Sequence, residues 1–285
     1  MTLSHSTSST RLLERPEGRI AYDIIGGSGP LLVAVPGMGD TRASYRILAP
    51  ALADAGYRVA TMDLRGHGDS DTTFSAFGAR ATGTDVLALV DHLAPTGPVV
   101  LLGNSMGAGS VVWAAAERPD VVTGLVLIGP VVRGGLSAVL QLVVDALLLR
   151  PWGPTFWVSY RRRLMKGGRP ADLAADEARL RASLARPGAW RAFRRTTHSS
   201  PATIEPRLRD VRARTLVVMG TADPDFKDAS GEAREVADLL HGTALLVDGA
   251  GHYPHVERPA EVTPAVLEFL AAVAPVRAKG AVQGA

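Results

Sequence analysis

Residues 99–107 read Val-Val-Leu-Leu-Gly-Asn-Ser-Met-Gly, and this stretch decides the fold. A short apolar run leads into the pattern Gly103-x-Ser105-x-Gly107, and a helix-like segment follows. A strand, a tight turn and a helix in this order expose the serine hydroxyl at the start of the helix, as in a nucleophile elbow. Glycines are needed because the serine backbone is strained, and a side chain at 103 or 107 would collide with a neighbouring strand or helix. The pattern predicts Ser105 as a nucleophile.

Apolar runs alternate with helix-like segments on both sides of this turn. Continuous apolar strands that alternate with helices are typical of a parallel sheet covered on both faces. We therefore expect an α/β fold with a mostly parallel central sheet flanked by helices. The expected strands are residues 18–25, 30–35, 57–62, 99–102, 122–128, 215–219 and 244–247, and the expected helices are 44–55, 84–93, 107–117, 229–240 and 262–273.

The alternation stops between residues 130 and 210, where no run resembles a buried strand. Helical segments are expected there at 136–149, 156–164, 172–184 and 189–196, together with three of the four tryptophans. These features predict an inserted helical cap at 130–210, between core segments 1–129 and 211–275, with a disordered tail at 276–285. The apolar segment 136–149 and the aromatic residues of the cap suggest an apolar roof over a pocket.

Charge is distributed unevenly along the chain. Residues 150–214 hold 15 arginines and one lysine against five acidic residues, whereas the whole chain has a net charge of only +3. No nucleic-acid motif accompanies these arginines, so we expect solvated helices and no nucleic-acid partner. An arginine of the cap that faces the pocket could pair with a substrate carboxylate.

Composition predicts a cytoplasmic protein. The chain has 285 residues, of which 46% are apolar, and no cysteine, which fits a reducing compartment. Its N-terminal residues lack the apolar segment of a signal peptide. Gln141 and Asp145 interrupt the longest apolar stretch, which is too short to span a bilayer. The sequence does not predict an oligomeric state.

A serine nucleophile needs a histidine base held by a carboxylate, in the chain order serine, acid, histidine. His252 lies in a glycine-rich loop after the last apolar strand and is the predicted base. His255 is the nearest competitor, although it can instead cap the following helix. We interpret His67 as structural. His198 lies in the inserted region, where it can contact substrate or solvent, and the surface histidines are expected to be His5, His92 and His241.

The acid is expected at the end of a strand between Ser105 and His252. Asp223 follows the strand at 215–219 and fits this position, and a buried aspartate there would fix the imidazole tautomer. Asp223 can also be a turn-capping residue, because Asp-Pro commonly starts a turn. Asp225 and Asp248 are the alternative candidates.

An oxyanion hole needs two backbone donors. The N–H of Met106, directly after the nucleophile, is one, and the N–H of Met38 in Pro36-Gly-Met-Gly39 is the other. The Met38 loop can equally be a plain glycine turn. No cofactor is expected and no metal site, because the pair His252 and His255 is too sparse to hold an ion.

At this point the sequence resembles the α/β-hydrolase fold superfamily, in its capped serine-hydrolase branch, over residues 18–275. The motifs that carry the resemblance are the elbow at 103–107, the acid loop at 220–223, the base loop at 251–252, and Asp63-Leu-Arg-Gly-His-Gly-Asp-Ser70. Many members have His-Gly where this chain has Pro36-Gly37. The Asn-Ser-Met core of the elbow is similar to that of C–C bond hydrolases, which usually carry tryptophan where this chain has Tyr253, and Ser-Met-Gly also occurs in cofactor-free haloperoxidases and perhydrolases.

Three functions follow from these residues. The first is a serine hydrolase that forms an acyl-enzyme on a small to medium, largely apolar ester, lactone or related carbonyl substrate. The second keeps Ser105, His252 and Asp223 for C–C hydrolysis, perhydrolysis or a biosynthetic lyase or cyclase step, because fold and triad do not fix the reaction. The third is a non-catalytic ligand-binding protein, which the complete set of three residues disfavours.

Overall fold

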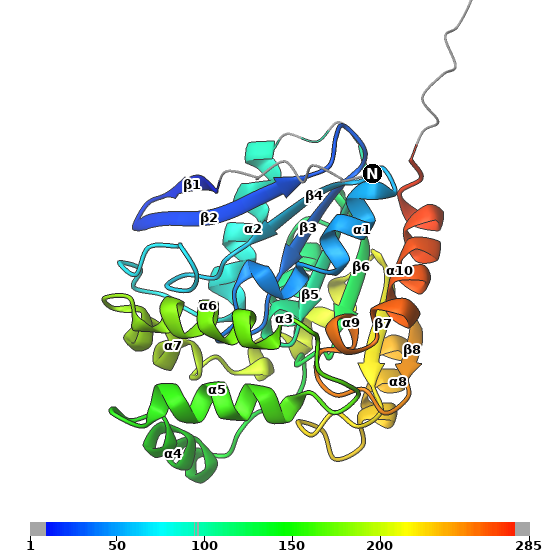
Figure 1. Ribbon diagram of the computed structural model, residues 1–285. Helices are drawn as coiled ribbons and strands as arrows, with labels where there is room; N and C mark the ends of the chain where they lie inside the picture. Colours follow the sequence, from blue (N-terminus) through cyan, green and yellow to red (C-terminus); the bar gives the residue numbers. More distant parts are fainter. Residues whose placement is uncertain (1–9, 94, 96, 277–285) are drawn as a thin grey trace, which may run out of the picture.

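The computed structural model describes residues 10–93, 95 and 97–276 (Figure 1). The predicted tail at 276–285 falls outside these residues except for its first position, and so does the N-terminal segment with His5. Between residues 10 and 276 the order of strands and helices is the expected α/β alternation.

An eight-stranded sheet forms the centre of the molecule, in the order β1-β2-β4-β3-β5-β6-β7-β8. Pairing is parallel from β4 to β8, and β1 and β2 join as an antiparallel edge. This confirms the mostly parallel sheet, but β1 was not expected. The strands are β1 (Arg11–Arg15), β2 (Gly18–Ile25), β3 (Leu31–Val35), β4 (Arg58–Met62), β5 (Val99–Asn104), β6 (Val122–Ile128), β7 (Arg214–Gly220) and β8 (Thr243–Val247).

Helices cover both faces of the sheet because the central strands are apolar on both sides. In β3, Leu31, Val33 and Val35 pack into one core, and Leu32 and Ala34 pack into the other. The first core is closed by α2 (Ala79–Leu93), α3 (Met106–Glu117) and α8 (Ala229–Leu239), and the second by α1 (Leu48–Asp54) and α10 (Pro259–Val273). The helix expected at 44–55 is divided into the 3₁₀ turn η1 (Arg42–Tyr45) and α1.

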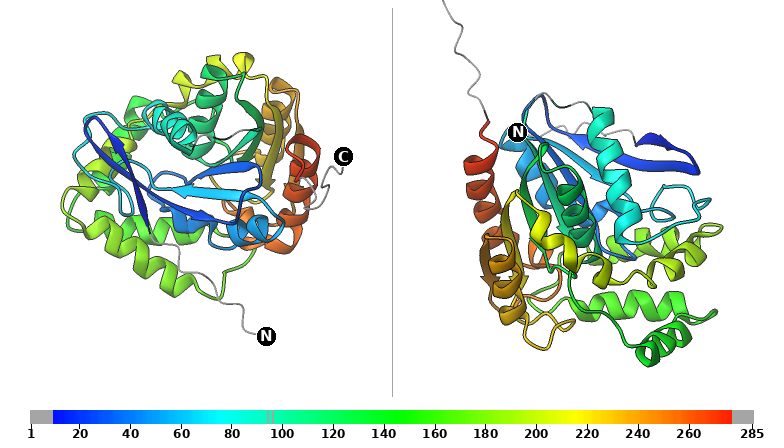
Figure 2. Two further views of the ribbon diagram at one scale, coloured as in Figure 1. Left: turned by 90° about the horizontal axis from the view of Figure 1, so that it is seen from above. Right: turned by 180° about the vertical axis from the view of Figure 1, so that it is seen from behind.

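Four helices lie between β6 and β7, over the carboxyl ends of the parallel strands (Figures 1 and 2). We call residues 130–210 the cap. Trp157, Trp190 and Phe193 form the centre of a small core within it. Its elements are α4 (Ala138–Leu147), α5 (Gly153–Leu164), α6 (Leu173–Ala185), α7 (Ala189–Thr196), η2 (Pro201–Thr203) and η3 (Glu205–Asp210).

From the sequence, the apolar segment 136–149 is expected to form a roof over a pocket. In the structure, none of the residues of α4 is buried. In Figure 1 it lies at the lower edge of the molecule, beyond α5. In the part of the chain that the structure describes, no helix has both the length and the apolar character that crossing a membrane requires.

Candidate active site

The turn between β5 and α3 holds Ser105 in the strained conformation that the glycine pattern predicts. Its φ is 56° and its ψ is −122°, a region that residues with a side chain rarely adopt. A Cβ at Gly103 would lie 2.4 Å from the carbonyl oxygen of Gly107, and a Cβ at Gly107 would lie 2.4 Å from that of Val35. The two glycines therefore let helix α3 and strand β3 approach the turn.

Asn104 connects the elbow to the neighbouring loops. Its side-chain amide donates to the carbonyl oxygen of Ile128 at 3.0 Å and to that of His252 at 3.2 Å. The Ser105 N–H also donates to Ile128, at 2.9 Å. The ends of β5 and β6 and the loop that carries His252 are thus joined at one buried side chain.

His252 and Asp223 lie in the loops after β8 and β7, at the same edge of the sheet as Ser105. The Nδ1 atom of His252 is 2.6 Å from Oδ2 of Asp223, and both side chains are buried. Burial alone would lower the pKa of His252, but the Asp223 carboxylate outweighs it and raises this pKa to about 9. An Nδ1–H that donates to Asp223 leaves Nε2 free to accept a proton.

The alternative acids lie elsewhere around this pair. Asp225 Oδ2 is 3.8 Å from the other ring nitrogen of His252, Nε2, and Tyr160 of α5 donates its hydroxyl to Asp225. Asp248 instead accepts from the hydroxyl of Thr221 at 3.2 Å. The structure therefore pairs Asp223, and not Asp248, with the imidazole Nδ1.

The competing histidine, His255, lies behind the site in a buried position. Its ring packs against Tyr45 at 5.4 Å between centroids, and burial lowers the pKa of His255 to about 3. Neither ring nitrogen has a hydrogen-bond partner among the described residues. Burial thus favours the neutral imidazole, and its packing on the tyrosine ring makes His255 part of the core.

The side chains that could bind a metal ion here already form hydrogen bonds with other side chains. Asp223, Asp225 and His252 are the group among residues 10–276, apart from the masked positions, whose ligand atoms lie within 4.8 Å of one another. An ion bound to this group would take an imidazole nitrogen or the Asp223 carboxylate. Its binding would therefore compete with the contact between His252 and Asp223.

The Pro36–Gly39 loop lies directly against the serine. The Asp40 N–H donates to the Gly37 carbonyl oxygen at 3.1 Å, and Gly39 has a φ of 75°, so Met38 and Gly39 form the corner of a turn. A Cβ added at Gly37 would be 3.0 Å from the Ser105 Cβ. No acceptor for the Met38 N–H occurs among the residues that the structure describes.

The second predicted donor, Met106, is the first residue of α3. An N–H at this position has no acceptor in the preceding turn of its own helix, and it carries the positive end of the helix dipole. The two predicted donors thus come from different elements, Met106 from α3 and Met38 from the turn that follows Gly37.

His67, which we interpret from the sequence as structural, supports the Met38 turn. Its Nε2 accepts from the Gly39 N–H at 3.2 Å, and its Nδ1 lies 2.9 Å from the Arg65 carbonyl oxygen. Burial lowers the pKa of His67, which favours the neutral ring that can accept at one nitrogen and donate at the other.

Asp40 links this turn to the cap and to the base loop, and sequence reasoning missed it. Its carboxylate accepts from the guanidinium of Arg161 in α5 and from the hydroxyl of Tyr253 at 2.7 Å. Arg161 also donates to Asp176 of α6 at 2.9 Å. All four side chains are buried, so the charges are compensated inside the protein.

Glu257, also missed from the sequence, holds the base loop on its other side. One carboxylate oxygen accepts from the N–H groups of Lys166, Gly167 and Gly251 at 2.6–2.9 Å, and the other accepts from Tyr253 at 3.0 Å. The His252 N–H donates to the carbonyl oxygen of Leu164, the last residue of α5, at 2.9 Å. The C-terminal end of α5 is therefore part of the frame around His252.

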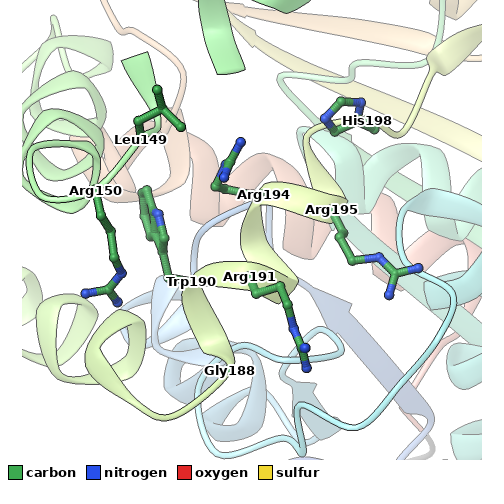
Figure 3. Close-up of a pocket in the computed structure, with 8 residues that line it drawn as sticks. All are labelled: Leu149, Arg150, Gly188, Trp190, Arg191, Arg194, Arg195 and His198. Atoms are coloured by element: carbon green, nitrogen blue, oxygen red, sulfur yellow. The ribbon is translucent and has the colours of Figure 1, made fainter. Parts of the chain in front are cut away.

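The arginines of the cap differ in how they are partnered. Arg161 is occupied by Asp40 and Asp176, so its guanidinium has no free face for a substrate. Other arginines surround a separate open cavity of about 680 Å³ between the end of α4 and α7 (Figure 3). His198 lies at the rim of this cavity and is paired with Asp145 at 3.0 Å. The lining residues are Leu149, Arg150, Gly188, Trp190, Arg191, Arg194, Arg195 and His198.

Comparison with known proteins identifies the family. Residues 32–265 match the sequence profile of the Alpha/beta hydrolase family. The 2-(acetamidomethylene)succinate hydrolase of Mesorhizobium japonicum is 28% identical over 89% of this chain and 92% of its own length. A 2-hydroxy-6-oxononadienedioate/2-hydroxy-6-oxononatrienedioate hydrolase of Klebsiella pneumoniae is also 28% identical, over 93% of this chain and 96% of its own.

The fold itself is shared with solved structures at low sequence identity. A bromoperoxidase from Bacillus anthracis superimposes with a TM-score of 0.79 at 21% identity, covering 92% of this chain and 99% of its own. The sheet order and the strand–turn–helix at Ser105 agree with the profile match over residues 32–265, which shows that the chain belongs to the alpha/beta hydrolase family.

Proposed function

We propose that the protein is a serine hydrolase that uses Ser105, His252 and Asp223 and passes through an acyl-enzyme. One observation carries this proposal. The strained serine at the start of α3 shares a sheet edge with an imidazole whose Nδ1 is held 2.6 Å from a buried aspartate. An imidazole held in this way presents Nε2 as the atom that accepts a proton.

The proposed reaction begins when Ser105 Oγ attacks the substrate carbonyl carbon and His252 Nε2 takes the hydroxyl proton. The N–H groups of Met38 and Met106 donate to the oxyanion, and each such donor typically contributes about 3 kcal/mol to the transition state. His252 then gives its proton to the leaving group as the carbon–oxygen bond breaks. A water molecule attacks the acyl-enzyme by the same route in reverse and restores Ser105.

For the substrate we propose a small to medium, largely apolar ester, lactone or related carbonyl compound. The turn at Met38 and Gly39 is covered by Trp157 of the cap, whose indole N–H donates to the Gly39 carbonyl oxygen at 3.3 Å. Residues 130–210 would thus act as the cap over this substrate. Pairing of a cap arginine with a substrate carboxylate stays a prediction, and Arg161 is not that arginine. We also propose a cytoplasmic location, from the lack of cysteine.

The Ser105→Ala variant tests the proposal. We expect it to lose hydrolysis of a short p-nitrophenyl ester, by at least about 10⁴-fold, because no other group can form the acyl-enzyme. A fluorophosphonate probe is expected to label the wild type at Ser105 and to leave the variant unlabelled. Undiminished turnover by the variant would overturn the proposal, and a folded wild type that takes no label would favour ligand binding over catalysis.

C–C bond hydrolysis is the second candidate, favoured by Asn104-Ser-Met106 in the elbow and by the relative from Klebsiella pneumoniae. The same Ser105 and His252 would serve this reaction. A panel that pairs short esters with ring-cleavage dienoates separates the two candidates. A kcat/KM at least tenfold higher on a dienoate than on any ester would replace ester hydrolysis as the proposed activity.

A further inference from the structure

The region around α4 exposes apolar side chains to an unusual extent. Of the eleven large hydrophobic residues that are exposed in the described chain, eight lie between positions 136 and 152. Val139 is 73% exposed and Leu142 is 69% exposed. The eight residues are Leu136, Val139, Leu140, Leu142, Val143, Leu147, Leu149 and Trp152.

Only a narrow face of α4 contacts the rest of the cap. Val144 packs against the small core that contains Trp157 and Phe193. Gln141 and Asp145 lie on the same face, where Gln141 donates to Asp145 and Asp145 pairs with His198. The opposite face, with Val139, Leu142 and Val143, is exposed in the described chain. A contiguous apolar face of this kind is typical of an interaction surface.

A cluster of arginines lies beyond the C-terminal end of α4, between this end and α7. Figure 3 shows Arg150 after the helix and Arg191, Arg194 and Arg195 on α7, around the cavity that also contains Leu149 and Trp190. None of these four arginines forms an ion pair with a described acidic residue, and the Nε of Arg194 is buried without a partner. Of the carboxylates near these arginines, Asp145 is already paired with His198, and Glu17 lies near Arg195, whose guanidinium donates to the Ser75 carbonyl oxygen.

We propose that α4 and these arginines dock the protein onto the surface of a lipid bilayer with anionic headgroups. An amphipathic helix whose apolar face enters the headgroup region, flanked by arginines and an exposed tryptophan, is the arrangement that such surfaces bind. The guanidinium groups of Arg150, Arg191 and Arg194 supply charge complementarity to phosphate groups. The apolar side chains, which are exposed in the described chain, would be buried in the bilayer.

A second copy of the chain fits this surface less well. In a two-fold symmetric contact the same patch meets itself, so the unpaired arginines of both copies would approach one another. Like charges without an intervening acid oppose such a contact. A bilayer surface fits both the arginines and the apolar side chains, because its phosphate groups lie beside an apolar interior.

The test is co-sedimentation of the full chain with vesicles of phosphatidylcholine containing about one third phosphatidylglycerol, and with vesicles of phosphatidylcholine alone. We expect the wild type to bind the anionic vesicles, and to be released as salt is raised. Each arginine near such a surface contributes roughly fivefold to partitioning. Arg150→Gln, Arg191→Gln and Arg194→Gln together should therefore weaken binding by about 100-fold.

A second variant separates the apolar contribution from the charge. Val139→Gln with Leu142→Gln keeps good helix formers at exposed positions, and we expect it to weaken binding at least about tenfold. One control outside the patch is Leu239→Gln, 46% exposed at the end of α8. The other is Arg209→Gln in η3 with Arg212→Gln between η3 and β7, both at exposed positions. These controls are expected to bind like the wild type.

Three outcomes would overturn the proposal. They are no binding of the wild type to anionic vesicles, an equal loss in the control variants, or a wild-type dimer that the α4 variant makes monomeric while neither binds vesicles. Because sedimentation does not depend on turnover, the Ser105→Ala chain should bind as the wild type does. The result therefore stands apart from the proposed hydrolase activity.

Discussion

Two regions of the cap differ in how much they contact the rest of the protein. The inner cap, residues 157–177, reaches the candidate site through Trp157, Tyr160, Arg161 and the backbone of Leu164 to Gly167. The outer cap, residues 136–152, buries almost nothing, and its helix α4 has no buried residue. The comparison shows that the cap is not a uniform cover. Its inner end belongs to the frame of the candidate site, and its outer end exposes apolar side chains.

The buried charges of the inner cap explain why it must stay in place. Removing a charge from water costs several kcal/mol, and this cost is recovered only while the partners remain together. Arg161 and Asp40 satisfy each other, and Tyr253 and Asp176 complete their hydrogen bonds. An inner cap that lifted away from the core would leave Asp40 uncompensated beside the Met38 turn.

The largest effect is expected from the substitution Arg161→Met. It leaves Asp40 and Asp176 buried without their common partner, which typically costs about 3–5 kcal/mol in the free energy of unfolding. Arg150→Met in the outer cap is the matched control, and we expect it to change this free energy by about 0.5 kcal/mol or less. Denaturant unfolding followed by circular dichroism measures both.

A double-mutant cycle makes this prediction specific to the buried pair. Asp40→Asn should relieve part of the loss in the Arg161→Met chain, so that the two effects together are smaller than their sum. If Arg161→Met proves as stable as Arg150→Met, the inner cap does not depend on this charge network and the contrast between the two ends is wrong.

A smaller effect is expected from Glu257→Gln. The amide keeps one acceptor oxygen, but its NH₂ group is a donor and takes the place of the other oxygen. A backbone N–H that donates to the carboxylate in the wild type then faces another donor, which costs about 2–3 kcal/mol of stability. The His252 loop is also expected to shift, so that kcat on a p-nitrophenyl ester falls at least about tenfold while KM changes little. Steady-state kinetics measures this loss.

Glu268→Gln is the control for this substitution because Glu268 is an exposed residue of α10. We expect its kcat and its unfolding midpoint to match the wild type. A Glu257→Gln chain with wild-type kcat would show that the four backbone contacts of this carboxylate do not position the base loop.

The fold could be predicted from the sequence because its signals are local. The apolar strands, the glycines around Ser105 and the helical segments each depend on neighbouring residues, and the sheet is mostly parallel as expected. Strand β1 escaped prediction because Arg11–Arg15 is short and three of its five residues are charged. This segment is a strand because it pairs with β2 as an antiparallel hairpin, and this pairing is not visible in the composition of the segment.

The candidate site was predictable where chain order limits the choice. Ser105, Asp223 and His252 follow strands whose carboxyl ends meet at one edge, and Asp223 is the acid that contacts the imidazole Nδ1. Their catalytic roles stay predictions. Asp40 and Glu257 carry no local pattern, because their partners Arg161 and Gly167 lie 121 and 90 residues away in the chain. Such pairs depend on where the cap comes to rest, which no short motif encodes.

The smallest effect, and the one that most sharpens the comparison, concerns the pH dependence of hydrolysis. His252 must be neutral at Nε2 to accept the serine proton, so kcat/KM should rise with pH until the His252 pKa of about 9 is passed. Asp225, which lies 3.8 Å from Nε2 and is bonded to Tyr160 of the inner cap, contributes to raising this pKa.

Asp225→Asn removes this charge, lowers the pKa of His252 and moves the rise of kcat/KM to lower pH, by roughly one pH unit or less. The variant should consequently be more active than the wild type near pH 7, where more of its imidazole is neutral. Asp248→Asn is the control, because Asp248 bonds to Thr221 and not to His252, and its profile should not move. A profile of Asp225→Asn that stays in place or moves to higher pH would show that the inner cap does not tune the base through Asp225, and would limit its role to holding the loops.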